Sequence, residues 1–169
     1  MKVTLIMTTT VDGFTTRNPN EDAGWVNEYD QLFFDEQTRA IGTVIIGSNS
    51  FRLLPEPFES RLNIVMTSTP DPGKNIEGLL EFTNAEPQDV LKQLDDRDIH
   101  EVALIGGPQL NASFLNEGLV DEVYILVAPK LFGEGVTLSS GYELDIPLKL
   151  LETRQLGENA VLLHYQVET

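Results

Sequence analysis

The sequence predicts an α/β fold with a mostly parallel central sheet, flanking helices and an antiparallel C-terminal hairpin. Two observations lead to this fold class. Short runs of apolar, often β-branched residues alternate with amphipathic segments along the first 128 residues, and such runs are typical of strands covered by helices on both faces. The end of the chain instead consists of two longer strand-like segments around a Gly157-Glu-Asn turn, which is typical of an antiparallel hairpin.

Short, largely apolar runs give the strands of the predicted sheet. They are Val3–Thr9, Thr43–Ile46, Leu62–Thr67, Leu80–Thr83, Glu101–Ile105 and Glu122–Val127. The hairpin is predicted from Leu148–Arg154 and Ala160–Glu168.

Three amphipathic segments are predicted as helices. In Trp25–Ile41 the apolar side chains recur close to every 3.6 residues. Pro87 suits a first helical turn and introduces the segment that runs to Asp95. Gln109–Glu117 ends before Gly118, and a glycine is the usual residue just after a helix.

Length and hydropathy favour one domain that covers residues 1–169. The 169 residues are 41% hydrophobic, which is enough to bury a core. There is no uninterrupted apolar run of 18 residues, and Val3–Met7 is too short for a membrane span or a secretion signal. We therefore expect a cytoplasmic protein that does not enter a membrane.

The charge and the missing residue types exclude several classes of function. A net charge of −16 repels polyanions, so nucleic acid is not an expected partner. The chain has no cysteine, and its two histidines, His100 and His164, are far apart in sequence. No metal site or thiol chemistry is therefore expected, and a small molecule is the expected partner.

Three predicted strands end in small or polar residues: Gly47-Ser48-Asn49-Ser50, Thr67-Ser68-Thr69 and Gly106-Gly107-Pro108-Gln109-Leu110. Ligands of open α/β sheets bind at the carboxyl ends of the strands, and free amides beside glycines and hydroxyls suit a phosphate. The same patterns also occur as simple tight turns and helix caps. The two commonest nucleotide motifs, G-x-G-x-x-G and G-x-x-x-x-G-K-[ST], are absent.

The order of these motifs resembles dihydrofolate reductases over nearly the whole chain. The matching stretches are Thr8-Thr-Thr-Val-Asp-Gly, Val44-Ile-Ile-Gly-Ser-Asn-Ser-Phe, Asn63-Ile-Val-Met-Thr-Ser and Val102-Ala-Leu-Ile-Gly-Gly. The segment from Ile105-Gly-Gly-Pro-Gln-Leu to Ala128-Pro-Lys-Leu-Phe-Gly-Glu-Gly is still more similar to the reductase half of the riboflavin-biosynthesis deaminase-reductase.

This resemblance implies a dihydrofolate-reductase-like fold that binds NADPH. By position, Gly47–Ser50 and Gly106–Leu110 would hold the pyrophosphate, with a cis peptide between Gly106 and Gly107. Thr67–Thr69 would meet the adenosine side. Ser48 stands where dihydrofolate reductases typically have an arginine that pairs with the 2′-phosphate of NADPH, which leaves NADH as an alternative cofactor. Arg52, Arg61 and Lys74 are the nearby basic candidates for that role.

The resemblance also implies a catalytic carboxylic acid, Asp30, with Trp25 and Phe34 on the substrate side. Asp12 and Phe51 complete the expected substrate-binding set. Asp30 and Phe34 are four residues apart, so a helix places them on one face, and burial beside aromatic rings would raise the pKa of the acid. The alternative is that Asp30 is one more solvated charge beside Glu28, Asp35 and Glu36.

The expected activity is therefore an NAD(P)H-dependent reduction of a small heterocycle. The resemblance assigns the reduction of 5-amino-6-(5-phosphoribosylamino)uracil. Dihydrofolate reduction is the second hypothesis, and a nucleotide-binding module without catalytic activity is the third. The apolar segment Ala160–Tyr165 of the hairpin favours a homodimer.

Overall fold

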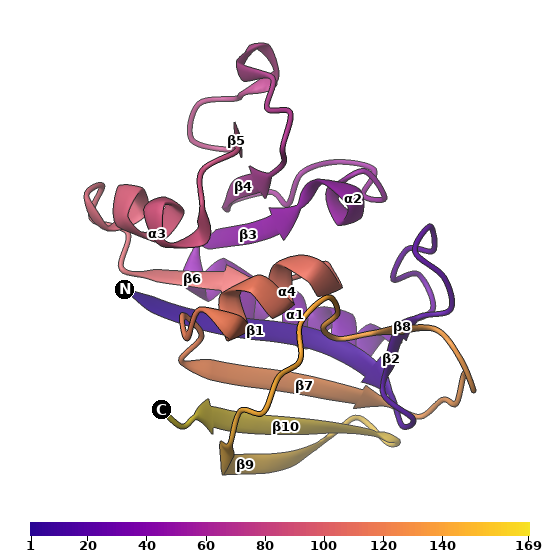
Figure 1. Ribbon diagram of the computed structural model, residues 1–169. Helices are drawn as coiled ribbons and strands as arrows, with labels where there is room; N and C mark the ends of the chain where they lie inside the picture. Colours follow the sequence, from indigo (N-terminus) through magenta and orange to yellow (C-terminus); the bar gives the residue numbers. More distant parts are fainter.

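The computed structural model describes residues 1–169, and its centre is an eight-stranded sheet with the order β5-β4-β3-β6-β1-β7-β10-β9 (Figure 1). Neighbouring strands pair in parallel from β5 to β7, and β10 pairs antiparallel with both β7 and β9. The predicted fold class is confirmed. The strands are β1 (Lys2–Thr10), β3 (Thr43–Gly47), β4 (Leu62–Met66), β5 (Leu80–Thr83), β6 (Glu101–Leu104), β7 (Glu122–Ala128), β9 (Leu148–Leu156) and β10 (Ala160–Val167).

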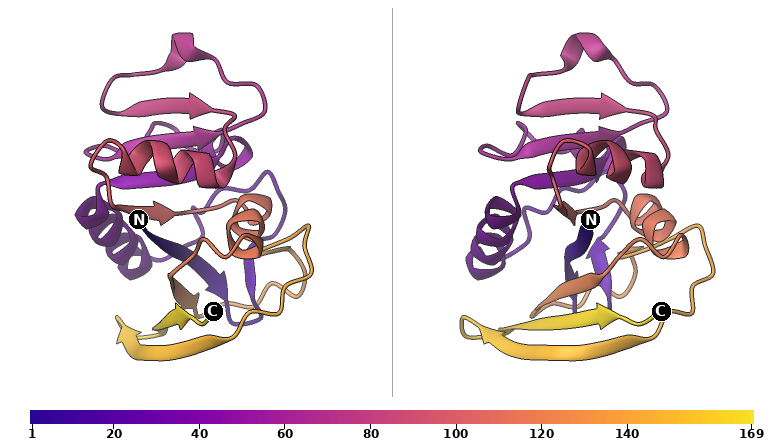
Figure 2. Two further views of the ribbon diagram at one scale, coloured as in Figure 1. Left: turned by 60° about the vertical axis from the view of Figure 1, so that its left-hand side comes forward. Right: turned by 90° about the vertical axis from the view of Figure 1, so that its left-hand side faces the viewer.

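Helices cover both faces of this sheet (Figure 2). The helix α1 (Glu28–Ile41) lies on one face, and α3 (Pro87–Asp95) and α4 (Pro108–Asn116) lie on the other. Gly118, with φ of 66°, follows α4 as expected. Two short helical turns, α2 (Ser48–Phe51) and a 3₁₀ turn at Pro72–Lys74, complete the set. None of the helices is long and apolar enough to cross a membrane.

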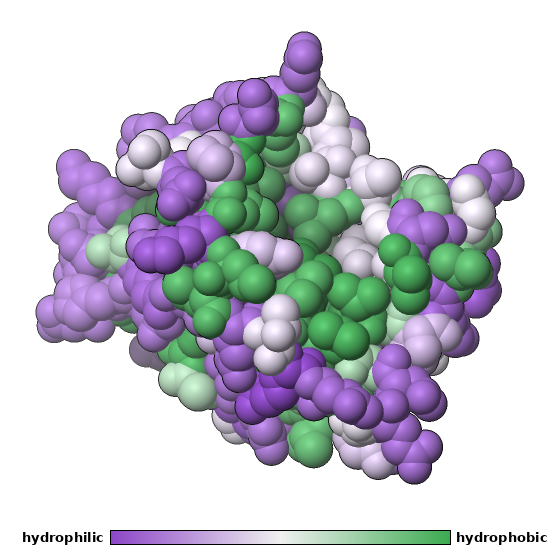
Figure 3. Space-filling model, turned by 90° about the horizontal axis from the view of Figure 1, so that it is seen from below, coloured by the Kyte–Doolittle hydropathy of each residue, from purple (hydrophilic) through white to green (hydrophobic).

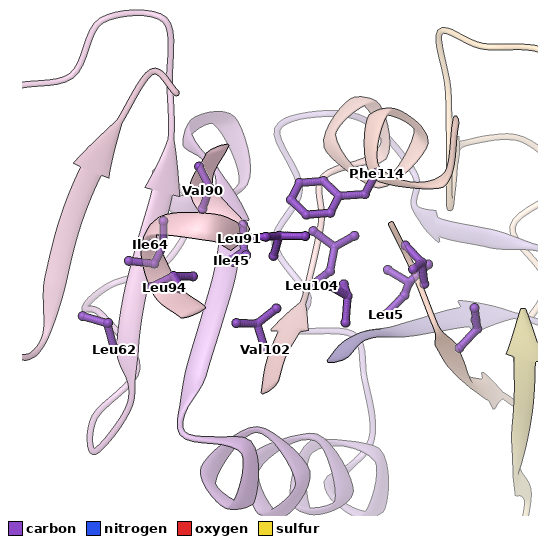
Figure 4. Close-up of a cluster of buried hydrophobic side chains, with 13 residues drawn as sticks. Leu5, Ile45, Leu62, Ile64, Val90, Leu91, Leu94, Val102, Leu104 and Phe114 are labelled. Carbon is purple, nitrogen blue, oxygen red and sulfur yellow. The ribbon is translucent and has the colours of Figure 1, made fainter. Parts of the chain in front are cut away.

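The two faces of the sheet have separate apolar cores, because successive side chains of a strand point to opposite sides. Figure 4 shows the larger core, in which Phe114 from α4 and Leu91 from α3 lie over Leu5, Ile45 and Leu104. On the other side, Phe33 from α1 packs against the alternate strand residues, which are Ile6, Val44, Ile46, Ala103 and Ile105 among others. This alternation explains why the strands read as continuously apolar in sequence.

The first helix begins three residues later than predicted. Asn27 is its N-cap, and the side chain of Asn27 accepts a hydrogen bond from the amide of Asp30. Asparagine is a preferred N-cap because its side chain satisfies an amide that has no partner within the helix. Trp25 therefore lies in the preceding loop, and the helix covers Glu28–Ile41 instead of Trp25–Ile41.

A small second sheet was not predicted. It pairs β2 (Phe14–Thr16) with β8 (Val136–Thr137) in antiparallel fashion. These strands have only three and two residues, and they lie about 120 residues apart in sequence, so no local pattern reveals them. Asn111 on α4 fixes the same region, because its side-chain amide donates to the carbonyl of Leu138 at 2.8 Å.

The C-terminal hairpin leaves apolar side chains in solvent. Leu148, Leu150, Leu151 and Val161 are between 40% and 52% exposed. Figure 3, which views the molecule from below the hairpin of Figure 1, shows hydrophobic residues gathered over the middle of this face.

Candidate functional site

A cleft of about 1190 Å³ opens at the carboxyl ends of β3, β4 and β6, beside β1. This is the edge at which ligands of open α/β sheets bind. Three groups of residues line it. They are the strand ends and the turns that follow them (Gly47–Ser50, Met66–Ser68 and Ile105–Leu110), the α1 face (Asp30, Gln31, Phe34 and Asp35) and the loop and second-sheet residues (Thr15, Thr16, Glu21, Asp22 and Gly135–Thr137).

The two predicted glycine segments meet in this cleft. The amide of Gly47 donates a hydrogen bond to the carbonyl oxygen of Gly106 at 2.8 Å. The peptide between Gly106 and Gly107 is cis, as the resemblance implied. A Cβ atom on Gly107 would lie 2.7 Å from Oγ of Ser50, so the Ser50 hydroxyl can hold its present position only beside a glycine.

Free main-chain amides remain at this junction. Gly47 is the N-cap of α2 and Gly107 is the N-cap of α4, and no side chain caps either helix. The first amides of a helix have no partner within it, which leaves those of Ser48, Asn49, Gln109 and Leu110 directed to the same end of the sheet. Such amides suit an anion such as a pyrophosphate.

Asp30 is fully buried, at 0% exposure, and lines the cleft. Its Oδ2 accepts a hydrogen bond from the side-chain amide of Asn27 at 2.9 Å, whereas its Oδ1 has no partner. Burial raises the pKa of Asp30, and the Asn27 hydrogen bond opposes this rise only in part. The alternative of a solvated Asp30 is therefore wrong, because the first turn of α1 points this carboxyl inward.

Phe34 also lines the cleft, one helical turn after Asp30. Its ring lies 5.6 Å from that of Phe58, which lines the cleft as well. Thr67 and Ser68 line the cleft at the end of β4. Thr69 is exposed and does not line the cleft.

Two predicted substrate-binding residues lie outside the cleft and fix loops instead. The indole Nε1 of Trp25 donates to the carbonyl of Thr15 at 3.1 Å, and its ring packs edge-on against Phe132. The carboxylate of Asp12 accepts hydrogen bonds from Oγ1 of Thr10 and from the amides of Phe132 and Gly133. These bonds lower the pKa of Asp12, with the Thr10 hydroxyl as the largest cause.

Phe51 and the basic residues also differ from expectation. Phe51 is directed away from the cleft and packs edge-on against Phe82 at 5.8 Å. Arg61 is a structural residue that is only 4% exposed; it donates to Oγ1 of Thr38 and pairs with Asp35 at 2.9 Å. Arg52 contacts Asn49 at the edge of the cleft, and Lys74 is an exposed side chain beside Asp71.

Several lining residues were missed by sequence reasoning. Thr15, Thr16, Glu21, Asp22 and Thr137 are in this group. They come from loops and from the short β2 and β8 strands, so their sequence carries no local signal. The lining contains no lysine, arginine or histidine, and no cluster of three potential metal ligands occurs anywhere in the structure.

Comparison with known families identifies one that matches most of the chain. Residues 58–162 match the family described as the RibD C-terminal domain. This chain belongs to that family. The matched residues include Thr67, Ser68 and the whole Gly106–Leu110 segment.

Curated relatives fall into two groups. The protein YwjB of Bacillus subtilis (strain 168) is 25% identical over 97% of both chains. The riboflavin biosynthesis protein RibD of Aquifex aeolicus is 30% identical over 44% of this chain and 22% of its own length. The 2,5-diamino-6-ribosylamino-4(3H)-pyrimidinone 5′-phosphate reductase of Methanothermobacter thermautotrophicus is 36% identical over 43% of this chain and 37% of its own length. The chain thus spans well under half of the two relatives with a named function.

Solved structures support the same fold. Acinetobacter baumannii RibD superimposes with a TM-score of 0.80 at 20% identity, over 99% of this chain and 58% of that one. A pyrimidine reductase-like protein of Corynebacterium diphtheriae gives a TM-score of 0.78 at 14% identity, over 99% of this chain and 92% of that one. At these identities the likeness establishes the fold and leaves the reaction to be argued from the site.

Proposed function

We propose that this chain is an NAD(P)H-dependent oxidoreductase that reduces a small heterocyclic substrate, resembling the reductase of riboflavin biosynthesis. One observation carries the proposal. The uncapped starts of α2 and α4 adjoin through the bond between Gly47 and Gly106, and the same cleft contains the buried carboxyl of Asp30. Anion-binding amides and a sheltered acid are the two parts that reduction by a dinucleotide requires.

The residues present fit such a cofactor. The amides of Ser48, Asn49, Gln109 and Leu110 would hold its pyrophosphate, and Gly107 leaves room for close approach beside Ser50. Thr67 and Ser68 would face the adenosine side. When bound, a reduced nicotinamide supplies a hydride to the carbon of a C=N or C=O group.

Asp30 is the proposed proton source for that reaction. The nitrogen or oxygen of the reduced bond must gain a proton as its carbon gains the hydride, and a carboxylic acid with a raised pKa can hold this proton near neutral pH. Burial raises the pKa of Asp30, and Oδ1 is free to face a ligand. Phe34 would orient a planar ring next to it.

NADPH is the proposed cofactor, with NADH as the alternative. No cation lines the cleft, and Arg52 contacts the lining residue Asn49. A titration of the protein with NADPH and NADH in parallel, followed by thermal unfolding, tests both, because a ligand of the native state raises its melting temperature. A failure of both dinucleotides to raise the melting temperature would refute the proposed function.

Turnover separates the remaining hypotheses. Oxidation of NADPH with an aminopyrimidine of the riboflavin pathway, such as 5-amino-6-(5-phosphoribosylamino)uracil, is expected for a riboflavin-type reductase. Oxidation with dihydrofolate would indicate a dihydrofolate reductase. Dinucleotide binding without turnover of any heterocycle would indicate the module without catalytic activity.

We also propose that the chain forms a homodimer through its C-terminal hairpin. The exposed leucines of β9 and Val161 of β10 offer an apolar surface, and contiguous apolar surface on a monomer commonly marks an interface.

A further inference from the structure

The charged residues of the cleft are all acidic. Glu21, Asp22, Asp30 and Asp35 line it, and no lysine, arginine or histidine does. The four carboxylates all come from the loop before α1 and from α1 itself, whereas the glycine segments that would hold the dinucleotide contribute none. The acidic side of the cleft is therefore the substrate side.

Two of these carboxylates are already paired with cations. Asp35 accepts from Arg39 at 2.8 Å and from Arg61 at 2.9 Å, which lowers the pKa of Asp35, with Arg39 as the largest cause. Glu21 pairs with Arg17 at 2.8 Å. That guanidinium also lies 4.7 Å from the ring of Phe132, so Arg17 is committed to fixing its own loop.

The other two carboxylates have no cationic partner. Oδ1 of Asp22 accepts only the amide of Gly24, at 2.8 Å. Asp30 accepts from Asn27 and is fully buried, and its Oδ1 is an unsatisfied polar atom at the cleft wall. A buried polar atom without a partner is costly unless a ligand completes it, so this second observation independently indicates a polar ligand here.

The surrounding charges offer no binding site for a phosphate either. Lys130 is the other cation near this loop, and its Nζ lies 5.9 Å from the ring of Trp25, outside the lining. A phosphate monoester carries about −1.5 to −2 charges at neutral pH, and the cleft lining offers no cation to pair with it.

We infer that the substrate is an electrically neutral or cationic aminopyrimidine without a phosphate group. The inference rests on the proposed reductase function and specifies its substrate class. It differs from the activity for which the Methanothermobacter relative is named, the reduction of a 5′-phosphate. Uncharged ring N–H groups and sugar hydroxyls can bond to Asp30 and Gln31, whereas a phosphate finds no counterion among the lining residues.

A matched pair of ligands tests this inference. 5-Amino-6-ribosylaminouracil and its 5′-phosphate are each titrated into the full chain, with and without saturating NADPH, and the shift in melting temperature and the value of kcat/KM are recorded. We expect at least about tenfold tighter binding and higher kcat/KM for the compound without phosphate. Equal or better binding of the 5′-phosphate overturns the inference, and so does the absence of binding by both compounds.

A charge variant provides the second readout. Asp22→Asn removes an unpaired negative charge, so we expect the affinity for the 5′-phosphate to rise about threefold to tenfold and that for the unphosphorylated compound to change less than twofold. The matched control is Glu28→Gln, which removes a charge on the same segment outside the cleft and should change neither affinity. A parallel titration with NADPH alone distinguishes the two proposals. If NADPH does not raise the melting temperature, the reductase function is refuted. The relative affinities for the two aminopyrimidines still measure the preference for a substrate without phosphate.

Discussion

The amide of Gly47 and the carbonyl oxygen of Gly106 are joined by a 2.8 Å hydrogen bond that links two segments 59 positions apart in sequence. β3 and β6 are adjacent in the sheet, so their carboxyl ends arrive side by side. The bond places the starts of α2 and α4 at one end of the cleft. The arrangement allows a chain with a net charge of −16 to present anion-binding amides without using lysine or arginine.

The first prediction concerns the packing at this junction. Gly107→Ala would place a Cβ atom 2.7 Å from Oγ of Ser50, so the hydroxyl has to leave its position in the cleft. We expect dinucleotide affinity to fall about tenfold, which corresponds to about 1.4 kcal/mol. Isothermal titration with NADPH measures this loss.

Two further variants are the controls for that change. Gly47→Ala adds a Cβ whose nearest contacts are 3.5 Å or more away, so its loss of affinity should be clearly smaller. Ser50→Ala removes the hydroxyl directly and should weaken binding in the same direction as Gly107→Ala. An equal loss in Gly47→Ala and Gly107→Ala would contradict the steric explanation.

The second prediction concerns Asp30 as the proton source. Asp30→Asn keeps the size of the side chain but cannot donate a carboxyl proton, so we expect kcat to fall about 100-fold or more. Dinucleotide affinity should stay within about twofold, because Asp30 lies on the substrate side. Glu28→Gln is the control in the same helical turn, and full turnover by Asp30→Asn would reject the assignment.

The raised pKa of Asp30 makes the stability of the protein depend on pH, and Asp30→Asn tests this dependence. Burial raises the folded-state pKa of Asp30 above its ordinary value of 3.8. The native state therefore holds the proton to higher pH than the unfolded state, and the stabilisation present below 3.8 is lost as pH rises through the folded pKa. Asn at position 30 cannot ionise, so the free energy of unfolding of Asp30→Asn should rise relative to that of the parent as pH increases above 3.8. Urea unfolding at a series of pH values measures this difference.

Much of the fold was predictable because its signals are local. β3, β4 and β6 are buried on both faces and read as unbroken apolar runs, and Gly118 marked the end of α4. The start of α1 was misplaced because Trp25 and Val26 extend the apolar periodicity into the loop. Asn27, the actual cap, carried the correct signal, since asparagine is among the preferred N-cap residues.

Of the candidate site, only the main-chain segments that contain the glycines could be predicted from the sequence. The glycine segments are contiguous in sequence, so their placement followed from strand order and resemblance. The direction of a side chain from a loop depends on contacts made across the fold. Trp25 forms a hydrogen bond with Thr15, and Asp12 forms hydrogen bonds with Phe132 and Gly133, about 120 positions later. No local sequence pattern indicates either contact.

The third prediction assigns Arg61 to stability and not to cofactor binding. Its guanidinium is buried and contacts Oγ1 of Thr38, Asp35 and the carbonyl of Glu59. Arg61→Met should destabilise the protein by about 2 kcal/mol, since hydrogen bonds to charged groups are each worth roughly that amount. Arg39→Met removes the exposed partner of Asp35 and should cost at most about 1 kcal/mol. Chemical denaturation measures both, and a selective loss of NADPH affinity in Arg61→Met would contradict the assignment.

The fourth prediction concerns the ion pairs of Glu122. Its carboxylate lies 2.9 Å from Nε2 of His164 and 3.2 Å from Nζ of Lys2. Burial alone would raise the pKa of Glu122, but the hydrogen bonds from His164 and Lys2 outweigh it and lower the pKa below its ordinary value of 4.5. This stabilisation is present above 4.5 and is lost as pH falls through the folded pKa.

Glu122→Gln should therefore be less stable than the parent by about 1 kcal/mol at neutral pH, with a gap that closes in acid. Glu101→Gln is the control, because Glu101 meets only Lys2, at 3.6 Å, and is more exposed. Urea unfolding over the acid range measures the gap. A gap that stayed constant with pH would show that the ion pairs do not cause it.

The last prediction concerns the homodimer and the way in which it forms. β9 is an edge strand, but its pairing with β10 shifts between His164 and Tyr165, so that Leu151 has no partner. A bulge of this kind disfavours the addition of another strand at the edge, so a second copy would cover the face of the hairpin and its exposed leucines. Sedimentation or light scattering should give a dimer mass for the parent and a monomer mass for Leu150→Lys. Glu152→Lys is the control, because Glu152 pairs with His164 on the opposite face of the hairpin, and it should leave the mass unchanged. A monomer mass for the parent over a full dilution series would reject the dimer, and an unchanged dimer in Leu150→Lys would reject the hairpin face as its interface.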